Sequence, residues 1–150
     1  MIIWLTGQPG SGKTTLANEL LKSIDEKKII NIDGDDLRLL NKNKDFSKEG
    51  RIKNISTAIS IARFLASKNY ICILSIVAPY RFLRDELKEE FSFLEVYLFT
   101  DEIRGREDYF AHDYEEPTDS KTLRLDTGKL TIKESVNEIL NVYRQMATLA

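Results

Sequence analysis

The stretch that decides the fold is residues 7–14, Gly-Gln-Pro-Gly-Ser-Gly-Lys-Thr, which fits the pattern G-x-x-x-x-G-K-[ST] at every position. A short apolar run, 2–6, precedes it and is typical of a buried strand, while apolar residues at helical spacing follow it over 14–24. In a strand–loop–helix unit of this kind the glycines let backbone N–H groups turn onto phosphate oxygens, and the helix N-terminus adds partial positive charge. The unit therefore indicates a site for a nucleoside triphosphate.

We expect ATP to contact this loop and the residue after it. Lys13 would reach the β- and γ-phosphates, and the Thr14 hydroxyl would ligate Mg²⁺. The pattern does not specify the acceptor of the phosphoryl group. The expected ATP contacts are Gly7, Gln8, Pro9, Gly10, Ser11, Gly12, Lys13, Thr14 and Thr15.

Apolar runs of strand length recur along the chain at 29–32, 70–77, 94–100 and 123–127. Helical spacing marks 51–67 and 131–146, and a short charged helix is expected over 81–91. Strands that alternate with helices predict an α/β fold with helices on both faces of a parallel sheet. We therefore expect the three-layer P-loop NTPase fold with five strands. The last helix would bury an apolar face of Ile132, Val136, Ile139, Leu140 and Tyr143.

Length and composition narrow the class of protein. A chain of 150 residues favours one domain, 1–150, in which the long polar stretch 101–121 would form a lid. The net charge of −2 argues against a protein that coats nucleic acid, and no apolar run approaches the length of a membrane span. No signal peptide is recognisable at the start, and a single cysteine, Cys72, rules out an internal disulfide, so a cytoplasmic setting is expected.

An acidic turn, 33–38, follows the second predicted strand and reads Asp-Gly-Asp-Asp-Leu-Arg. Phosphoryl transfer needs a carboxylate near Mg²⁺ or the acceptor hydroxyl and a cation for the developing charge, and this turn supplies both. Such residues are also common in solvated turns. A functional role is favoured because the turn should lie beside the phosphate loop at the carboxyl ends of the strands.

A third set of residues lies at the start of the next predicted helix. Arg51 and Asn54 are three residues apart, so they share a helix face, and Phe46 comes just before. An aromatic ring, an arginine and an amide would suit a base and a phosphate. The alternative is a core phenylalanine and a surface arginine, and spacing alone does not decide between them.

Taken together, these motifs resemble those of the adenylylsulfate kinase family, whose members phosphorylate the 3′-hydroxyl of adenylyl sulfate with MgATP. The resemblance covers most of the chain in the same order. Residues 33–38 are similar to D-G-D-N-[VI]-R, 46–55 to F-S-x-x-D-R-x-E-N-I, 75–81 to S-F-I-S-P-Y-R, 113–117 to P-Y-E-x-P and 123–128 to L-x-L-D-T-G.

The resemblance implies a role for each matching residue. Asp35 would be the catalytic carboxylate at the acceptor hydroxyl and would share the metal with Thr14, while Asp33 would be its neighbour in the metal site and Lys13 would serve catalysis. The acceptor, a small-molecule nucleotide, would be bound by Arg38, Arg51 and Asn54 at its 5′ anionic group, by Phe46 and Phe110 on its base, and by Val77.

The chain departs from the family's pattern at several positions. Ala78 replaces the serine of S-P-Y, Gly50 replaces an aspartate, and Asp36 replaces an asparagine. The family's basic lid segment K-G-L-Y-x-K-A-R is missing, and Arg104 and Arg106 could take the place of its lysines. The shortened lid leaves the acceptor open.

Adenylyl sulfate, in sulfate assimilation, is the first expectation for the acceptor, and cytidine diphosphoramidate is an alternative. Two other classes compete with these: a nucleotide-dependent switch with slow ATP hydrolysis, and a small kinase for a sugar or a nucleic-acid end. Part of the last helix could also serve a homodimer.

Overall fold

The computed structural model of the protein describes residues 1–149. Its sheet has five parallel strands in the order β2-β3-β1-β4-β5, so the expected sheet is confirmed. The strands are β1 (Ile2–Thr6), β2 (Ile29–Asp33), β3 (Ile71–Ser75), β4 (Phe93–Phe99) and β5 (Leu123–Asp126).

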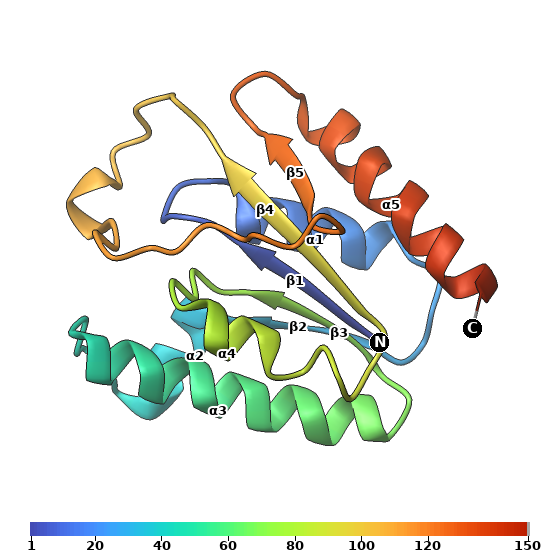
Figure 1. The fold of residues 1–150 in the computed structure, drawn as a ribbon, viewed down its shortest axis with the longest axis horizontal. Helices are drawn as coiled ribbons and strands as arrows, with labels where there is room; N and C mark the ends of the chain where they lie inside the picture. Colours follow the sequence, from blue (N-terminus) through green and yellow to red (C-terminus); the bar gives the residue numbers. More distant parts are fainter. Residues whose placement is uncertain (150) are drawn as a thin grey trace.

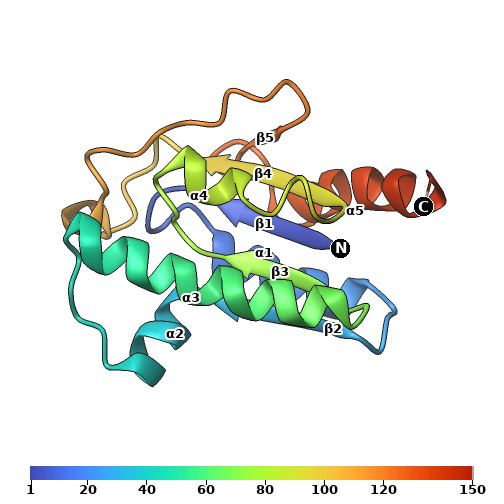
Figure 2. The same ribbon diagram turned by 60° about the horizontal axis from the view of Figure 1, so that its bottom comes forward.

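Helices cover both faces of this sheet (Figures 1 and 2). One face carries α1 (Lys13–Ser23) and α5 (Ile132–Leu149), and the other carries α2 (Gly34–Asn41), α3 (Lys48–Ser67) and α4 (Arg81–Asp85). The central strand β1 is buried throughout and apolar from Ile2 to Leu5, because alternate side chains enter opposite layers. Ile2 and Trp4 pack with α3, while Ile3 and Leu5 pack with α1 and α5. The helices on both faces thus bury the strand that leads directly into the phosphate loop.

Two helix starts differ from the prediction because polar side chains cap them. The turn expected at 33–38 is the first part of α2, since the Asp33 Oδ1 atom accepts hydrogen bonds from the backbone N–H groups of Asp35 (3.0 Å) and Asp36 (3.3 Å). The α3 helix begins at residue 48 rather than 51, where Ser47 Oγ accepts from the Gly50 N–H at 3.3 Å. Both caps lie beside the site described below.

Two other predictions overestimated the length of one helix and the burial of one residue. The helix expected over 81–91 ends at Asp85, and the backbone continues in turns closed by i→i+3 hydrogen bonds such as that from the Lys88 N–H to the Asp85 carbonyl. Ile132 is 54% exposed, because it belongs to the first turn of α5, before the buried part of the helix. Val136, Ile139 and Leu140 are core residues, as expected.

The lid, residues 101–121, is irregular apart from one 3₁₀ turn, η1 (Glu107–Tyr109). It lies on the side of the molecule where the carboxyl ends of the strands meet (Figure 1). Within residues 1–149, none of the helices has the length and apolar character that a membrane span requires. The lid therefore lies over the carboxyl ends of the strands, where parallel α/β folds bind their ligands.

Candidate active site

A cavity of about 650 Å³ opens at the carboxyl ends of β1, β2 and β3. The phosphate loop forms one side and the start of α3 another, and the lid closes the rim. This is the place that parallel α/β folds use for ligands. The residues that line it are Pro9, Gly10, Gly12–Thr15, Asp33–Asp35, Arg38, Phe46, Arg51, Asn54, Ile55, Ser75–Pro79, Arg104, Arg106 and Tyr109.

The phosphate loop takes a shape that its glycines require. Gly12 has a φ of 105°, in the left-handed region that glycine adopts at no steric cost, and it caps α1. A Cβ atom on Gly7 would lie 2.3 Å from the Leu98 carbonyl oxygen, so the loop passes close to β4. The sequence motif therefore folds as expected for a phosphate cradle.

Lys13 is held inside this loop. Its Nζ atom donates hydrogen bonds to the carbonyls of Gly7 (3.0 Å) and Gln8 (2.8 Å), and only 8% of the residue is exposed. Burial lowers the pKa of Lys13 to about 8, while the carboxylates of Asp35 and Asp33 act in the opposite direction. A phosphate in the loop would offer this ammonium group a stronger partner than two carbonyls.

Two aspartates at the end of β2 have different surroundings. Asp33 is buried, and its Oδ2 atom accepts hydrogen bonds from the hydroxyls of Thr14 (3.0 Å) and Ser75 (2.8 Å). Its Oδ1 atom caps α2, so both oxygens of this carboxylate are occupied. Asp35 lines the cavity, and no hydrogen bond holds its carboxylate within residues 1–149. The Asp33 carboxylate is thus fixed by its hydrogen bonds, whereas the Asp35 carboxylate is free to contact a ligand in the cavity.

The Thr14 hydroxyl contacts one of the two expected carboxylates. That carboxylate belongs to Asp33, at 3.0 Å, and the expectation that Asp35 shares the metal with Thr14 stays a prediction. Asp33 is the N-cap of α2 and contacts the loop, whereas Asp35 lies in the first turn of this helix and faces the cavity. Mg²⁺ binds to oxygen ligands, usually one or two carboxylates with water and phosphate, and the oxygens of Thr14 and Asp33 fit that preference.

Phe46, Arg38 and Arg51 form a connected group on the acceptor side. The Arg38 guanidinium lies 4.1 Å from the centre of the Phe46 ring, and Arg51 Nε donates to the Phe46 carbonyl at 2.9 Å. Burial lowers the pKa of Arg38, and the nearby charge of Arg51 lowers it further. Two arginines this close to each other favour an anion between them.

Asn54 is buried in the wall between these arginines and the acidic turn. Its Nδ2 atom donates to the Gly34 carbonyl at 3.2 Å, which ties α3 to α2. Its Oδ1 atom is buried without a hydrogen-bond partner among residues 1–149. Val77 also lines the cavity, as expected for the segment after β3.

The lid differs from the prediction in its aromatic residue. Phe110 does not line the cavity, whereas Tyr109 does, with its ring centre 6.3 Å from that of Phe46 and an angle of 55° between the rings. The 3₁₀ turn of the lid ends at Tyr109 and directs this ring, rather than the next one, toward Phe46. Tyr109 and Phe110 are adjacent aromatic residues in the sequence, and the sequence alone does not show which of the two faces the cavity.

Three loop residues expected at ATP, Gly7, Gln8 and Ser11, do not line the cavity. The Gln8 side chain instead binds the lid: its Nε2 atom donates to the Ala111 carbonyl at 2.8 Å, and its Oε1 atom accepts from the Ala111 N–H at 2.9 Å. Arg104 makes a second link, from its guanidinium to the Gly10 carbonyl (2.9 Å). No local pattern predicts the Gln8 contact, because its partner lies 103 residues away.

The chain is similar to known proteins of one family. The family model for adenylylsulphate kinase matches residues 1–108, which include the loop, the acidic segment and the start of the lid. A probable adenylyl-sulfate kinase of Pyrococcus abyssi is 32% identical, over 98% of this chain and 97% of that protein. A hexameric APS kinase from Thiobacillus denitrificans is 29% identical with a TM-score of 0.72, over 93% of this chain and 28% of that one.

The fold is also that of the Mycobacterium tuberculosis APS kinase solved with AMPPNP and APS. The TM-score is 0.79, the identity 24%, and the coverage 95% of this chain and 96% of that one. At this identity the likeness concerns the fold. The family match, which spans most of the chain, together with the cavity described above, leads to one conclusion: the chain belongs to the adenylylsulphate kinase family.

Proposed function

We propose that the protein transfers the γ-phosphoryl group of ATP to the 3′-hydroxyl of adenylyl sulfate and so forms 3′-phosphoadenylyl sulfate. One observation carries this proposal. A single cavity contains the phosphate loop, an aromatic and arginine-rich acceptor side, and Asp35, whose carboxylate is free of hydrogen bonds to residues 1–149. Family membership supports the choice of acceptor.

On the ATP side, the backbone of the phosphate loop and Lys13 act on the phosphates. Lys13 would exchange its two carbonyl partners for β- and γ-phosphate oxygens, which stabilises the charge that develops during transfer. Thr14 and Asp33 would hold Mg²⁺, which would supply charge neutralisation at the same phosphates. Arg106 of the lid lines the same cavity, with its side chain beside Gly10 of the phosphate loop, so it would serve the same anion.

Asp35 is the residue that we assign as the general base. A base must be free to accept the proton of the attacking hydroxyl, and Asp33 is already an acceptor in four hydrogen bonds. The carboxylate of Asp35 also lies close enough to Lys13 to raise its pKa. The hydroxyl would therefore be deprotonated beside the phosphoryl group that it attacks.

The acceptor nucleotide would lie between α2, α3 and the lid. Arg38 and Arg51, which line the cavity, would bind its 5′ phosphosulfate, and the base would stack on the aromatic pair of Phe46 and Tyr109. Arg51 also holds the Phe46 backbone, so the anion site and the base site are built as one unit. Tyr109 thus takes the place that the sequence had indicated for Phe110.

Three further features stay predictions. We propose that residues 1–150 form one domain with the lid at 101–121, and that the protein acts in the cytoplasm on small nucleotides. A homodimer is also proposed, and sedimentation in solution tests it. The buried face of α5 would not serve the homodimer, because Val136, Ile139 and Leu140 pack into the core of this chain.

A panel of acceptors tests the proposed function. ADP release from ATP is measured with adenylyl sulfate, cytidine diphosphoramidate, plain nucleoside 5′-monophosphates, gluconate, and no acceptor. Turnover with adenylyl sulfate well above every other arm is the expected result. Turnover with another acceptor alone would reassign the pocket, and slow hydrolysis that ignores all acceptors would favour a nucleotide-dependent switch.

A further inference from the structure

The wall of the cavity after β3 is held in place by hydrogen bonds from groups that lie outside the cavity. Three successive carbonyls, those of residues 77–79, each accept a hydrogen bond from outside the cavity: from Thr6 Oγ1 (2.7 Å), from Arg84 Nη1 (2.6 Å) and from the Glu115 N–H (2.7 Å). Ala78 has a φ of 44°, which is unfavourable for a residue with a Cβ atom. The course of this wall is therefore imposed by its partners.

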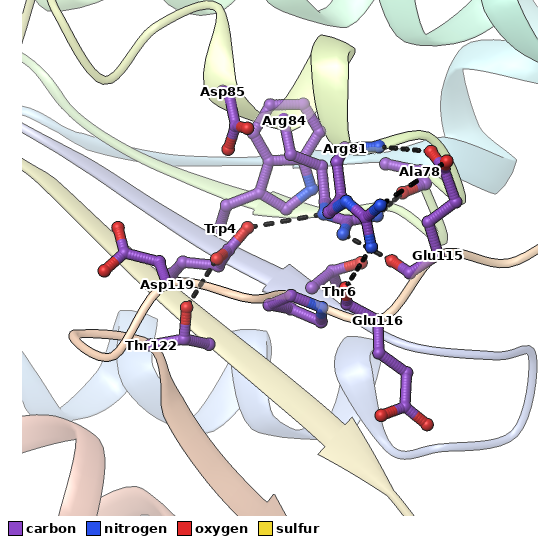
Figure 3. A network of polar contacts seen from close by, with 12 residues as sticks. Trp4, Thr6, Ala78, Arg81, Arg84, Asp85, Glu115, Glu116, Asp119 and Thr122 are labelled. Atoms are coloured by element: carbon purple, nitrogen blue, oxygen red, sulfur yellow. Dashed lines mark hydrogen bonds and ion pairs between the residues drawn. The ribbon is translucent and has the colours of Figure 1, made fainter.

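Arg84 is the one charged member of this set, and it is fully buried at 0% exposure. Besides the Ala78 carbonyl it binds the Glu115 carbonyl through Nη2, so its guanidinium bridges the cavity wall and the second half of the lid. Figure 3 shows Arg84 beside Ala78 and Glu115, with dashed lines for its hydrogen bonds to them. Its third contact, from Nε to Glu95 Oε2 at 3.3 Å, fixes it to β4.

Glu95 anchors this network to the sheet. It is 5% exposed in the middle of β4, and its Oε1 atom accepts hydrogen bonds from Thr122 Oγ1 (2.6 Å) and from Lys88 Nζ (3.4 Å). Thr122 directly follows the lid. The buried pair of Arg84 and Glu95 thus connects one sheet strand with the cavity wall and with two points on the polypeptide that returns from the lid.

A buried ion pair of this kind is a poor way to gain stability, because desolvation offsets much of the attraction. The planar fork of an arginine, however, donates in fixed directions to several acceptors at once. Here the acceptors belong to three segments that are far apart in the sequence: 78, 95 and 115. The chemistry is suited to setting the relative position of these segments.

We infer that Arg84, anchored by Glu95, is a positioning residue for the acceptor. It keeps the wall at residues 76–79 in register with the second half of the lid, so that the acceptor meets a preformed pocket. The inference rests on the proposed function for its kinetic readout. The pair touches neither substrate, because neither side chain lines the cavity, and it acts through the segment after β3, which belongs to the acceptor side of the cavity.

A paired substitution separates position from stability. Arg84→Met alone would leave Glu95 as a buried unpaired charge, so the test uses Arg84→Met together with Glu95→Gln, which keeps an acceptor for Thr122. The matched control is Arg63→Met with Glu90→Gln, which removes an exposed ion pair between α3 and the turns after α4. A third variant, Arg84→Lys, keeps the charge and loses the fork.

The expected result is a selective loss. In Arg84→Met/Glu95→Gln and in Arg84→Lys, kcat/KM for adenylyl sulfate should fall about 10- to 100-fold through a higher acceptor KM, the scale of a misplaced substrate. The Kd for ATP should stay within about twofold, a change of ~0.4 kcal/mol. The control pair should match the wild type. An unchanged acceptor KM, or equal losses for both substrates, would overturn the inference.

Hydrogen exchange tests the same inference without turnover. The Glu115 amide, which donates to the Pro79 carbonyl, should exchange faster in Arg84→Met/Glu95→Gln, while the Leu16 amide in α1 should not change. Equal exchange at Glu115 in both proteins would count against the network. A wild-type protein that ignores adenylyl sulfate would instead refute the proposed function and leave the exchange result standing.

Discussion

The two halves of the cavity are built in different ways. The ATP half comes mostly from one stretch within residues 9–15, where backbone N–H groups are expected to bind phosphate. The acceptor half comes from α2, α3, the segment after β3 and the lid, where the side chains of Arg38, Phe46 and Arg51 are expected to bind. Backbone sites tolerate sequence change outside their glycines, whereas a side-chain site changes its ligand with a few substitutions. The acceptor half is therefore where this chain departs from its family.

The largest expected effect concerns the residue between the halves. Asp35→Asn should lower kcat by at least ~100-fold, the range for a lost general base, because an amide cannot take the hydroxyl proton. The Kd for ATP, measured by calorimetry, should stay nearly unchanged. Asp36→Asn, the next carboxylate and one that does not line the cavity, is the control. Wild-type turnover in Asp35→Asn would remove Asp35 from the mechanism.

A substitution in the acceptor half should separate the two substrates. Arg51→Ala should raise the acceptor KM by about tenfold or more, the scale of a lost hydrogen bond to a charged group, and leave the KM for ATP alone. Steady-state kinetics with each substrate varied in turn measures this. Arg63→Ala, at an exposed arginine elsewhere on α3, should have no effect. A higher KM for ATP alone would mean that the acceptor site is misplaced.

Gly50 tests one departure from the family pattern directly. A Cβ atom here would lie 2.2 Å from the Asp45 carbonyl oxygen, so the loop before Phe46 packs against a helix position that must lack a side chain. Gly50→Ala should cost about 1–3 kcal/mol of unfolding free energy, as overpacking does, and raise the acceptor KM severalfold. Ser60→Ala, at an exposed position of α3, is the control. If Gly50→Ala had the same unfolding free energy as the wild type, the loop before Phe46 would have to move at no cost, and the prediction would be wrong.

The smallest effect is a pH dependence in the ATP half. Phosphate favours the charged form of Lys13 and so raises its pKa from about 8, which means that ATP binding takes up a proton. Affinity should thus be constant near pH 7 and fall severalfold as pH rises past 8, at most about tenfold per unit. Calorimetry in buffers of different ionisation enthalpy measures the proton. Lys13→Arg should bind with a flat profile, and a flat wild-type profile would contradict this account.

The same contrast explains what the sequence could and could not predict. The phosphate loop and the parallel sheet followed from local patterns, whereas the placement of Phe46 and Arg51 at the cavity was expected only from the family resemblance. The helix after Asp33 was missed, although an aspartate followed by two acidic residues is a good start signal for a helix. The lid contacts of Tyr109 and Gln8 depend on partners 63 and 103 residues away, which no local pattern reports.

The central claim is that both halves act on one reaction at the 3′-hydroxyl. The most direct measurement is product analysis by phosphorus NMR after incubation with MgATP and adenylyl sulfate. The account predicts one 3′-phosphorylated adenylyl sulfate for each ADP formed, and no product from the 3′-deoxy analogue. ADP without phosphorylated nucleotide, or phosphate at another position, would contradict it.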